Sequence, residues 1–286
     1  MGHLIKLFRP HQYIKNIFIL APLLFSFQFD SYSIIHTFIA VVLFSLSSSS
    51  IYILNDYFDI EADRNHPTKK ERPLASGKVS VRNAFIMMGV LMVGVLFVAF
   101  FYNFNLFVIL ALYIFMNILY SAWLKHIAIV DIFIISTGFV FRIFAGSVAI
   151  DVSPSHWIIL ITFLFALFLA LAKRRDDVLL SLKGEETRKS IDGYNLEFVN
   201  AGMVLMAGVT IVSYVLYTLS PDVMVRFHSD YLYLTTFFVI LGVIRYMQIT
   251  FVEQKSGSPT KIALEDRFIQ IVASLWIASF FMIHNI

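Results

Sequence analysis

The chain has 286 residues, of which 59% are hydrophobic, 30 are Phe and none is Cys, and its formal net charge is +3. Apolar residues make up about 45–50% of ordinary soluble domains, so this composition excludes a soluble globular protein and indicates an integral membrane protein. Because cysteine is absent, a disulfide framework, a thiolate nucleophile and a thiolate metal site are excluded as well.

Apolar segments close to the ~20 residues that a spanning helix needs recur along the whole chain. We therefore expect an all-α integral membrane protein with about eight or nine transmembrane helices, built as one domain over residues 1–286. The first segment is the shortest, and an interfacial position is an alternative for it because Pro10, Lys15 and Pro22 interrupt its neighbourhood. The expected segments are 15–29, 33–55, 83–101, 104–123, 127–150, 155–172, 198–219, 230–252 and 267–284.

Positive charge gathers on one side of the membrane. If the N-terminus is cytoplasmic, all of the 22 Lys and Arg residues except Arg142, Arg226 and Arg245 fall on cytoplasmic segments. A bias of this kind sets the orientation of membrane proteins. The two longest hydrophilic loops, at 57–82 and 173–197, then face the cytoplasm, and we expect the chemistry to take place there.

A cluster of acidic residues follows the second apolar segment, in the sequence NDYFDIEAD that begins at Asn55. At ~100° per residue, Asp59, Asp63 and Asp56 fall about 40°, 80° and 100° from Asn55 on a helix, so all four share one face. Mg²⁺ prefers oxygen ligands such as these. An ordinary solvated helix end is the alternative, but carboxylates at a helix C-terminus are unfavourable to its dipole. We expect Asn55, Asp59 and Asp63 to bind Mg²⁺, with Asp56 beside them as a further catalytic carboxylate.

The loop after these acidic residues is strongly basic, and Pro67 is expected to end the helix before it. Lys69, Lys70 and Arg72 are suited to phosphate oxygens, because Arg presents a planar fork of donors and Lys a point charge. Carboxylates followed by cations predict a magnesium-diphosphate site. The alternative is that these cations only anchor the loop at the cytoplasmic surface.

Further cations are candidates for binding a second phosphate. Lys15, near the N-terminus, and Lys173 and Arg174, at the start of the second long loop, are equally well explained as anchors at the membrane interface. Arg142 lies within an apolar segment, where an ionisable residue is costly unless it faces a polar cavity or a partner. Arg245 is a weaker candidate, because a structural ion pair with an acidic group would explain it.

The acidic cluster has the pattern Asn-Asp-x-x-Asp-x-x-x-Asp and lies on the second of the expected helices. This pattern resembles the first signature of the UbiA superfamily of intramembrane prenyltransferases. Within that superfamily, the chain is more similar to the decaprenyl-phosphate phosphoribosyltransferases. The segments that carry this closer likeness are 9–16, 61–77, 138–142 and 172–174.

The resemblance implies a UbiA-type bundle with a central cavity open to the cytoplasmic side of a bacterial inner membrane. It implies a Mg²⁺-dependent pentosyltransferase of cell envelope biosynthesis, which moves a 5-phosphoribosyl group from phosphoribosyl diphosphate to a polyprenyl phosphate and releases diphosphate. We expect no nucleic acid among the partners. On this reading Lys69, Lys70 and Arg72 bind the donor phosphates. The cations assigned to either the 5-phosphate or the lipid phosphate are Lys15, Arg142, Lys173 and Arg174.

One departure from the superfamily pattern separates the candidate activities. Members that transfer prenyl groups usually carry a second Asp-x-x-x-Asp motif in the later loop, where this chain reads KRRDD from Lys173 to Asp177. The Asp-x-x-x-Asp spacing is absent there, which counts against transfer of a prenyl group. A prenyltransferase that moves an isoprenoid onto an aromatic or other acceptor is therefore only the second candidate. A transporter of anionic solutes is a third, and it gives no reason for the oxygen ligands at one membrane face.

Overall fold

The computed structural model describes residues 2–65, 69–184, 189–255 and 257–284. Throughout these ranges the regular structure is helical, and no β-strand occurs in them. The expectation of an all-α membrane protein is confirmed.

Long apolar helices dominate the described residues, and eight of them are long and apolar enough to cross a membrane. The helices that form these spans are α3 (Ser31–Phe58), α5 (Val81–Tyr102), α6 (Phe104–Ala122), α7 (Val130–Ala149), α8 (His156–Leu182), α9 (Leu196–Thr218), α11 (Thr236–Phe251) and α13 (Arg267–His284). The span of α11 also includes the 3₁₀ helix η5 (Leu232–Thr235).

Shorter helices connect or precede these spans. They are α1 (Gly2–Phe8), η1 (Pro10–Leu20), α2 (Ala21–Ser26), α4 (Ile60–Asn65), η2 (Lys69–Glu71), η3 (Leu124–His126), η4 (Lys189–Gly193), α10 (Pro221–Phe227) and α12 (Pro259–Glu265). The expected first segment, 15–29, is thus not a spanning helix. It divides into η1 and α2, each with a proline in its first turn, and α2 ends at Phe27 in the left-handed conformation.

Polar residues at the starts of the apolar helices explain where several of them begin. The Asp30 side chain accepts a hydrogen bond from the Ser33 backbone N–H at 3.0 Å and caps α3. Asn103 caps α6 in the same way, through the Leu106 N–H at 3.0 Å. Such caps satisfy backbone donors that have no partner within the helix.

The described chain divides into two compact units, one comprising residues up to Ser155 and the other most of the chain from His156 onward. Each unit contains four of the eight candidate spans. The expectation of a single domain over the whole chain stays a prediction.

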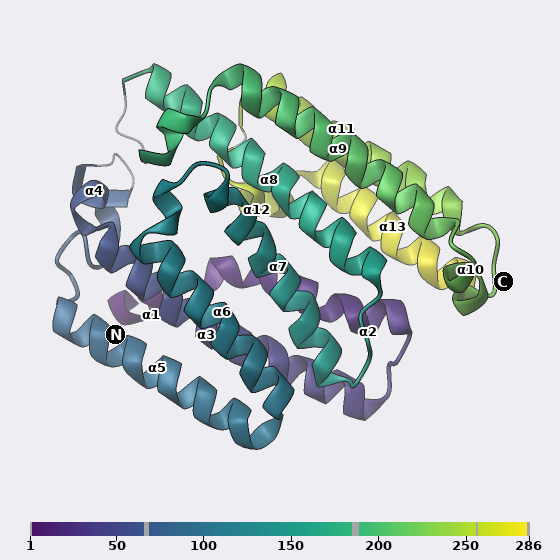
Figure 1. The fold of residues 1–286 in the computed structure, drawn as a ribbon, viewed down its shortest axis with the longest axis horizontal. Coiled ribbons are helices and arrows are strands. Elements are labelled where there is room, and N and C mark those ends of the chain that lie inside the picture. The colour runs from purple at the N-terminus through teal and green to yellow at the C-terminus, as the bar shows by residue number, and fades with distance from the viewer. Residues whose placement is uncertain (1, 66–68, 185–188, 256, 285–286) are drawn as a thin grey trace. The chain divides into compact units, whose positions relative to one another are not determined.

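In the first unit, α3 packs against α5, α6 and α7 (Figure 1). Phe44 and Leu110 are fully buried in the core that these helices share. The 3₁₀ helix η1 lies close against α7 at Gly146, where an added Cβ would be 2.0 Å from the Ile19 carbonyl oxygen. Only a glycine permits this approach.

Buried serines of α3 hold the N-terminal segment in place. Ser45 Oγ accepts a hydrogen bond from Asn16 Nδ2 at 2.7 Å. Ser49 Oγ lies 2.7 Å from the Tyr13 hydroxyl and donates to the Phe8 carbonyl oxygen at 3.0 Å. The polar face of α3 is therefore used to fix the position of η1.

In the second unit, α8 packs against α9, and α11 packs against α9 and α13. Arg245 of α11 forms ion pairs with Asp266 at 2.7 Å and Glu253 at 2.9 Å. The structural explanation of Arg245 is confirmed, because its charge is neutralised by these carboxylates.

Candidate active site

The acidic cluster lies where α3 ends and α4 begins. The sequence predicts one uninterrupted helix here, but α3 stops at Phe58, Asp59 has φ −98° and ψ 3°, and α4 starts at Ile60. Backbone hydrogen bonds from Asp59 N to Asn55 O at 3.0 Å and from Asp63 N to Asp59 O at 2.7 Å keep the spacing of four residues across the break.

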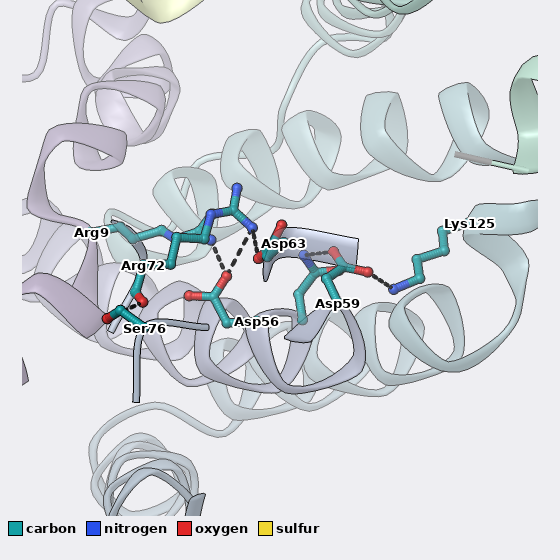
Figure 2. A network of polar contacts seen from close by, with 8 residues as sticks. Arg9, Asp56, Asp59, Asp63, Arg72, Ser76 and Lys125 are labelled. Carbon is teal, nitrogen blue, oxygen red and sulfur yellow. Dashed lines mark hydrogen bonds and ion pairs between the residues drawn. The ribbon is translucent and has the colours of Figure 1, made fainter. Parts of the chain in front are cut away.

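The carboxylates of this cluster are bound to cations (Figure 2). Arg72 Nη1 donates to Asp63 at 2.6 Å and to Asp56 at 3.1 Å, so one guanidinium bridges two carboxylates. Asp56 also forms an ion pair with Arg9. Lys125 Nζ donates to Asp59 at 2.6 Å. Asp56, Asp59 and Asp63 are therefore each compensated by a positive charge within the first unit.

Asn55 provides a test of whether these residues fit a metal ion. Its Nδ2 donates to Asp59 at 3.0 Å, while its Oδ1 is buried and has no hydrogen-bond partner among the described residues. A buried acceptor without a donor is costly, and a cation would satisfy it. The oxygen donors of Asn55, Asp59 and Asp63 thus fit the preference of Mg²⁺.

The cluster is not a complete metal cage by itself. In the described part of the chain, no group of three His, Cys, Asp or Glu side chains converges closely enough to hold a metal ion. Mg²⁺ typically binds through one or two carboxylates, with waters and substrate phosphates as the other ligands. The arrangement is therefore suited to a metal ion that arrives with a phosphorylated substrate.

Two cations of this network were not expected as partners of the acidic cluster. Lys125, in η3, is only 3% exposed, and Arg9 precedes η1 with a left-handed backbone, φ 51°. The sequence places both among the cytoplasmic cations and does not show that they face the carboxylates. The sequence feature that could have indicated a buried role for Lys125 is its position in a short, largely apolar connection, between Leu124 and Ile127.

The expected basic loop is brought to the carboxylates through Arg72. Lys69 is half-buried and Lys70 is exposed. Pro67, which was expected to end the helix, lies outside the described residues, and α4 ends at Asn65.

Lys173 and Arg174 belong to α8 in the second unit. Arg174 is 1% exposed and forms an ion pair with Asp177. Their predicted role as phosphate ligands stays a prediction.

Of the remaining predicted cations, Lys15 lies in η1 and Arg142 of α7 forms a hydrogen bond with η1. Arg142 Nε donates to the Asn16 side-chain oxygen at 2.8 Å, and its Nη1 donates to the Gly138 carbonyl oxygen at 2.7 Å. Asn16 directly follows Lys15, which is half-buried.

Comparison with known proteins assigns the chain to a family. A sequence model described as the UbiA prenyltransferase family matches residues 17–272. The chain belongs to the UbiA prenyltransferase family. Members of this family are transferases, and the predicted resemblance to it is confirmed.

Similar proteins within the family include decaprenyl-phosphate phosphoribosyltransferases. The one from Mycolicibacterium smegmatis is 34% identical over 96% of this chain and 90% of its own length. The one from Corynebacterium glutamicum is 31% identical over 96% of this chain and 84% of its own length.

Solved UbiA homologues share the fold. The homologue from Archaeoglobus fulgidus bound to DMAPP and Mg²⁺ has a TM-score of 0.73 and 18% identity, and the match covers 99% of both chains. The homologue from Aeropyrum pernix has a TM-score of 0.69 and 13% identity, over 96% of this chain and 98% of that chain. The expected UbiA-type helical fold is therefore confirmed.

Proposed function

We propose that this protein transfers a 5-phosphoribosyl group from phosphoribosyl diphosphate to a polyprenyl phosphate and releases diphosphate. The observation that carries the proposal is the similarity, over 96% of the chain, to decaprenyl-phosphate phosphoribosyltransferases that are 31–34% identical. The site geometry supports it, because oxygen ligands and phosphate-binding cations occur together at the end of α3.

In this proposal Asn55, Asp59 and Asp63 hold Mg²⁺ on the diphosphate of the donor. The ion would neutralise the negative charge that develops on the leaving group. Arg72 and Lys125 donate to Asp63 and Asp59 in the structure, and phosphate oxygens are equivalent acceptors for these cations. Both carboxylates and cations therefore have partners on a metal-bound diphosphate.

The remaining assignments follow the charge of the substrates. Lys69 and Lys70 bind further phosphate oxygens of the donor. Asp56 positions Arg9 and Arg72, with which it forms ion pairs. Lys173 and Arg174, of the second unit, are proposed ligands of a phosphate as well. The site faces the cytoplasm of a bacterial inner membrane, because the basic loops gather on that side.

The reaction needs no general base from the protein. A polyprenyl phosphate oxygen attacks the anomeric carbon of the ribose as the bond to the diphosphate oxygen breaks, and the electron pair of that bond leaves with diphosphate. A phosphate monoester already carries about −1.5 to −2 charge at pH 7, so its nucleophilic oxygen is deprotonated. The protein accelerates transfer by orientation and by electrostatic stabilisation.

A donor panel tests the proposal. Purified protein in detergent is given Mg²⁺, a polyprenyl phosphate and phosphoribosyl diphosphate labelled in the ribose, and the organic phase is counted. We expect label in the lipid only when all three are present. Transfer from a prenyl diphosphate to an aromatic acid, with no label in the lipid, would favour a prenyltransferase instead.

A further inference from the structure

A groove of about 260 Å³ lies between α9 and α11 of the second unit, which pack against each other (Figure 1). It is formed where α9 ends and where η5 and α11 begin. The residues that line it are Val215, Leu219, Tyr233, Thr236, Phe237 and Ile240. The volume is below the roughly 300–1,000 Å³ of a site for a drug-sized molecule. A small groove with mainly apolar walls suits a single hydrocarbon chain.

Thr236 brings a polar group to this groove. The residue is 8% exposed, and its hydroxyl has no hydrogen-bond partner among the described residues. The adjacent Thr235 hydroxyl, in contrast, donates to the Leu232 carbonyl oxygen at 2.7 Å and lies 2.6 Å from the Tyr214 hydroxyl. A buried hydroxyl without a partner is costly. Because a helical Thr has two accessible χ1 rotamers, which exchange the hydroxyl and the methyl group, an acceptor in the groove can receive this hydrogen bond.

Tyr233 carries a second hydroxyl at the groove. Its side chain is 44% exposed, and its hydroxyl has no hydrogen-bond partner in the part of the chain that the structure describes. Tyrosine is typical of the boundary between membrane and water, where its ring and its hydroxyl meet different surroundings. Since α11 begins here, Ile240 lies further along the helix, toward the membrane interior. The groove thus has hydroxyls at its start and apolar walls beyond them.

We infer that this groove binds one chain of a diacyl phospholipid, with an ester carbonyl of the lipid accepting a hydrogen bond from Thr236 or Tyr233. The ester carbonyls of a phospholipid lie between its headgroup and its hydrocarbon chains, the depth at which these hydroxyls occur. A polyprenyl chain fills an apolar groove but offers no carbonyl. The site lies at the end of α9 away from its start, which follows Lys173 and Arg174 of α8 along the chain, so it is not part of their proposed phosphate site.

A pair of matched lipids tests this inference. The unfolding temperature of the purified protein in detergent is measured with increasing amounts of a diacyl phosphatidylglycerol or of its dialkyl ether analogue, because a ligand that binds the folded state stabilises it. The two lipids share chains and headgroup and differ in the ester carbonyls. We expect the diacyl lipid to bind at least about threefold more tightly, the effect of one hydrogen bond.

The hydroxyls are removed together in the double variant Thr236→Val/Tyr233→Phe, which changes little of the shape of the groove. We expect this variant to bind the two lipids equally. The control is Thr210→Val/Tyr231→Phe, since both residues lie outside the groove. The Thr210 hydroxyl already donates within α9, to the Met206 carbonyl oxygen at 2.6 Å, and Tyr231 is exposed. The control should keep the preference for the diacyl lipid.

The place of the chain is tested by Val215→Phe, which fills part of the groove and should weaken the diacyl lipid by at least about threefold, the loss expected when a few buried CH₂ contacts are displaced. A preference below threefold in the unmodified protein, or an unchanged preference in Thr236→Val/Tyr233→Phe, overturns the inference. It is also overturned if Val215→Phe weakens an added polyprenyl phosphate and leaves the diacyl lipid unaffected, since the groove then holds a prenyl chain. None of these results depends on which group the protein transfers.

Discussion

Asp59 and Asp63 are the residues on which the proposed chemistry depends most directly. We predict that Asp59→Asn and Asp63→Asn each lower kcat by about 10²–10³-fold, because charge stabilisation at the leaving group is lost. Steady-state kinetics at several Mg²⁺ concentrations measure this effect. Glu61→Gln is the control, since Glu61 is exposed and its ion pair among the described residues is with Arg64.

Unchanged activity in both Asp variants would remove the magnesium assignment. A loss of activity accompanied by an equal loss in Glu61→Gln would point to a general effect of charge at this end of α3 instead.

Arg72 is predicted to contribute to stability as well as to binding. It is one-quarter exposed, and among the described residues its loss removes the cation paired with Asp63 and leaves Arg9 as the cation paired with Asp56. We expect Arg72→Gln to lower the free energy of unfolding by about 2–3 kcal/mol, somewhat less than for a fully buried pair. Denaturation in detergent without substrate measures this change.

Arg64→Gln provides the comparison for Arg72. The Arg64–Glu61 pair is exposed on both sides, so its loss should cost less than about 1 kcal/mol. Equal destabilisation by the two variants would show that the Arg72 bridge has no special role.

Lys15 gives a pH dependence whose direction follows from its environment. Its pKa is lowered to about 8 by burial first and then by Arg142, and the other charged or titratable groups that act on it are Tyr113 and Arg9. Only the protonated amine attracts an anion, so kcat/KM should fall as the pH rises through about 8 in the free enzyme. Lys15→Arg should shift this fall to higher pH, since Arg stays protonated. Identical pH profiles for both proteins would contradict the assignment.

At the scale of elements, the contact between η1 and α7 can be tested at Gly146. We predict that Gly146→Ala destabilises the protein, because the new methyl group would displace η1 from α7. Thermal unfolding of the purified protein measures this effect.

Gly94→Ala is the matched control for Gly146→Ala. Gly94 also lies in an apolar helix, α5, but nothing is within 4 Å of an added Cβ there. Alanine should be neutral or stabilise by up to about 1 kcal/mol at this position. If the two substitutions behaved alike, close packing of η1 on α7 would not explain the glycine.

The elements show where sequence reasoning succeeds and where it stops. The long apolar helices were predicted because hydropathy depends on local composition. For the first segment the sequence left a span and an interfacial position open, and the structure divides it into η1 and α2, which begin at or next to Pro10 and Pro22. The break at Asp59 was also missed, because an interruption of one residue leaves the spacing of the acidic residues unchanged.

The acidic cluster itself was predicted from its spacing, whereas its partners were not. Arg72 follows closely in the sequence, but Lys125 reaches Asp59 from another helix connection and Arg9 reaches Asp56 from the N-terminus. Contacts between residues so far apart in sequence depend on tertiary packing, which a single sequence does not contain. The same holds for Asn16, which links Lys15 to Arg142.

For the whole molecule, the family and the fold follow from the comparisons with known proteins, whereas the transferred group does not follow from the fold. Membership of the UbiA prenyltransferase family and the shared fold with its solved homologues are established by the comparisons. A fold does not determine a substrate, and related proteins on this fold act on different donors. The activity is therefore decided by which group the protein transfers to the lipid.

A double-label experiment identifies the transferred group. Phosphoribosyl diphosphate labelled with ¹⁴C in the ribose and ³²P in the diphosphate is incubated with the protein, Mg²⁺ and a polyprenyl phosphate. We expect ¹⁴C in the lipid, ³²P-diphosphate in the aqueous phase, and equal molar amounts of the two products. Diphosphate label in the lipid, or both labels remaining in unreacted donor, would contradict the proposed transfer.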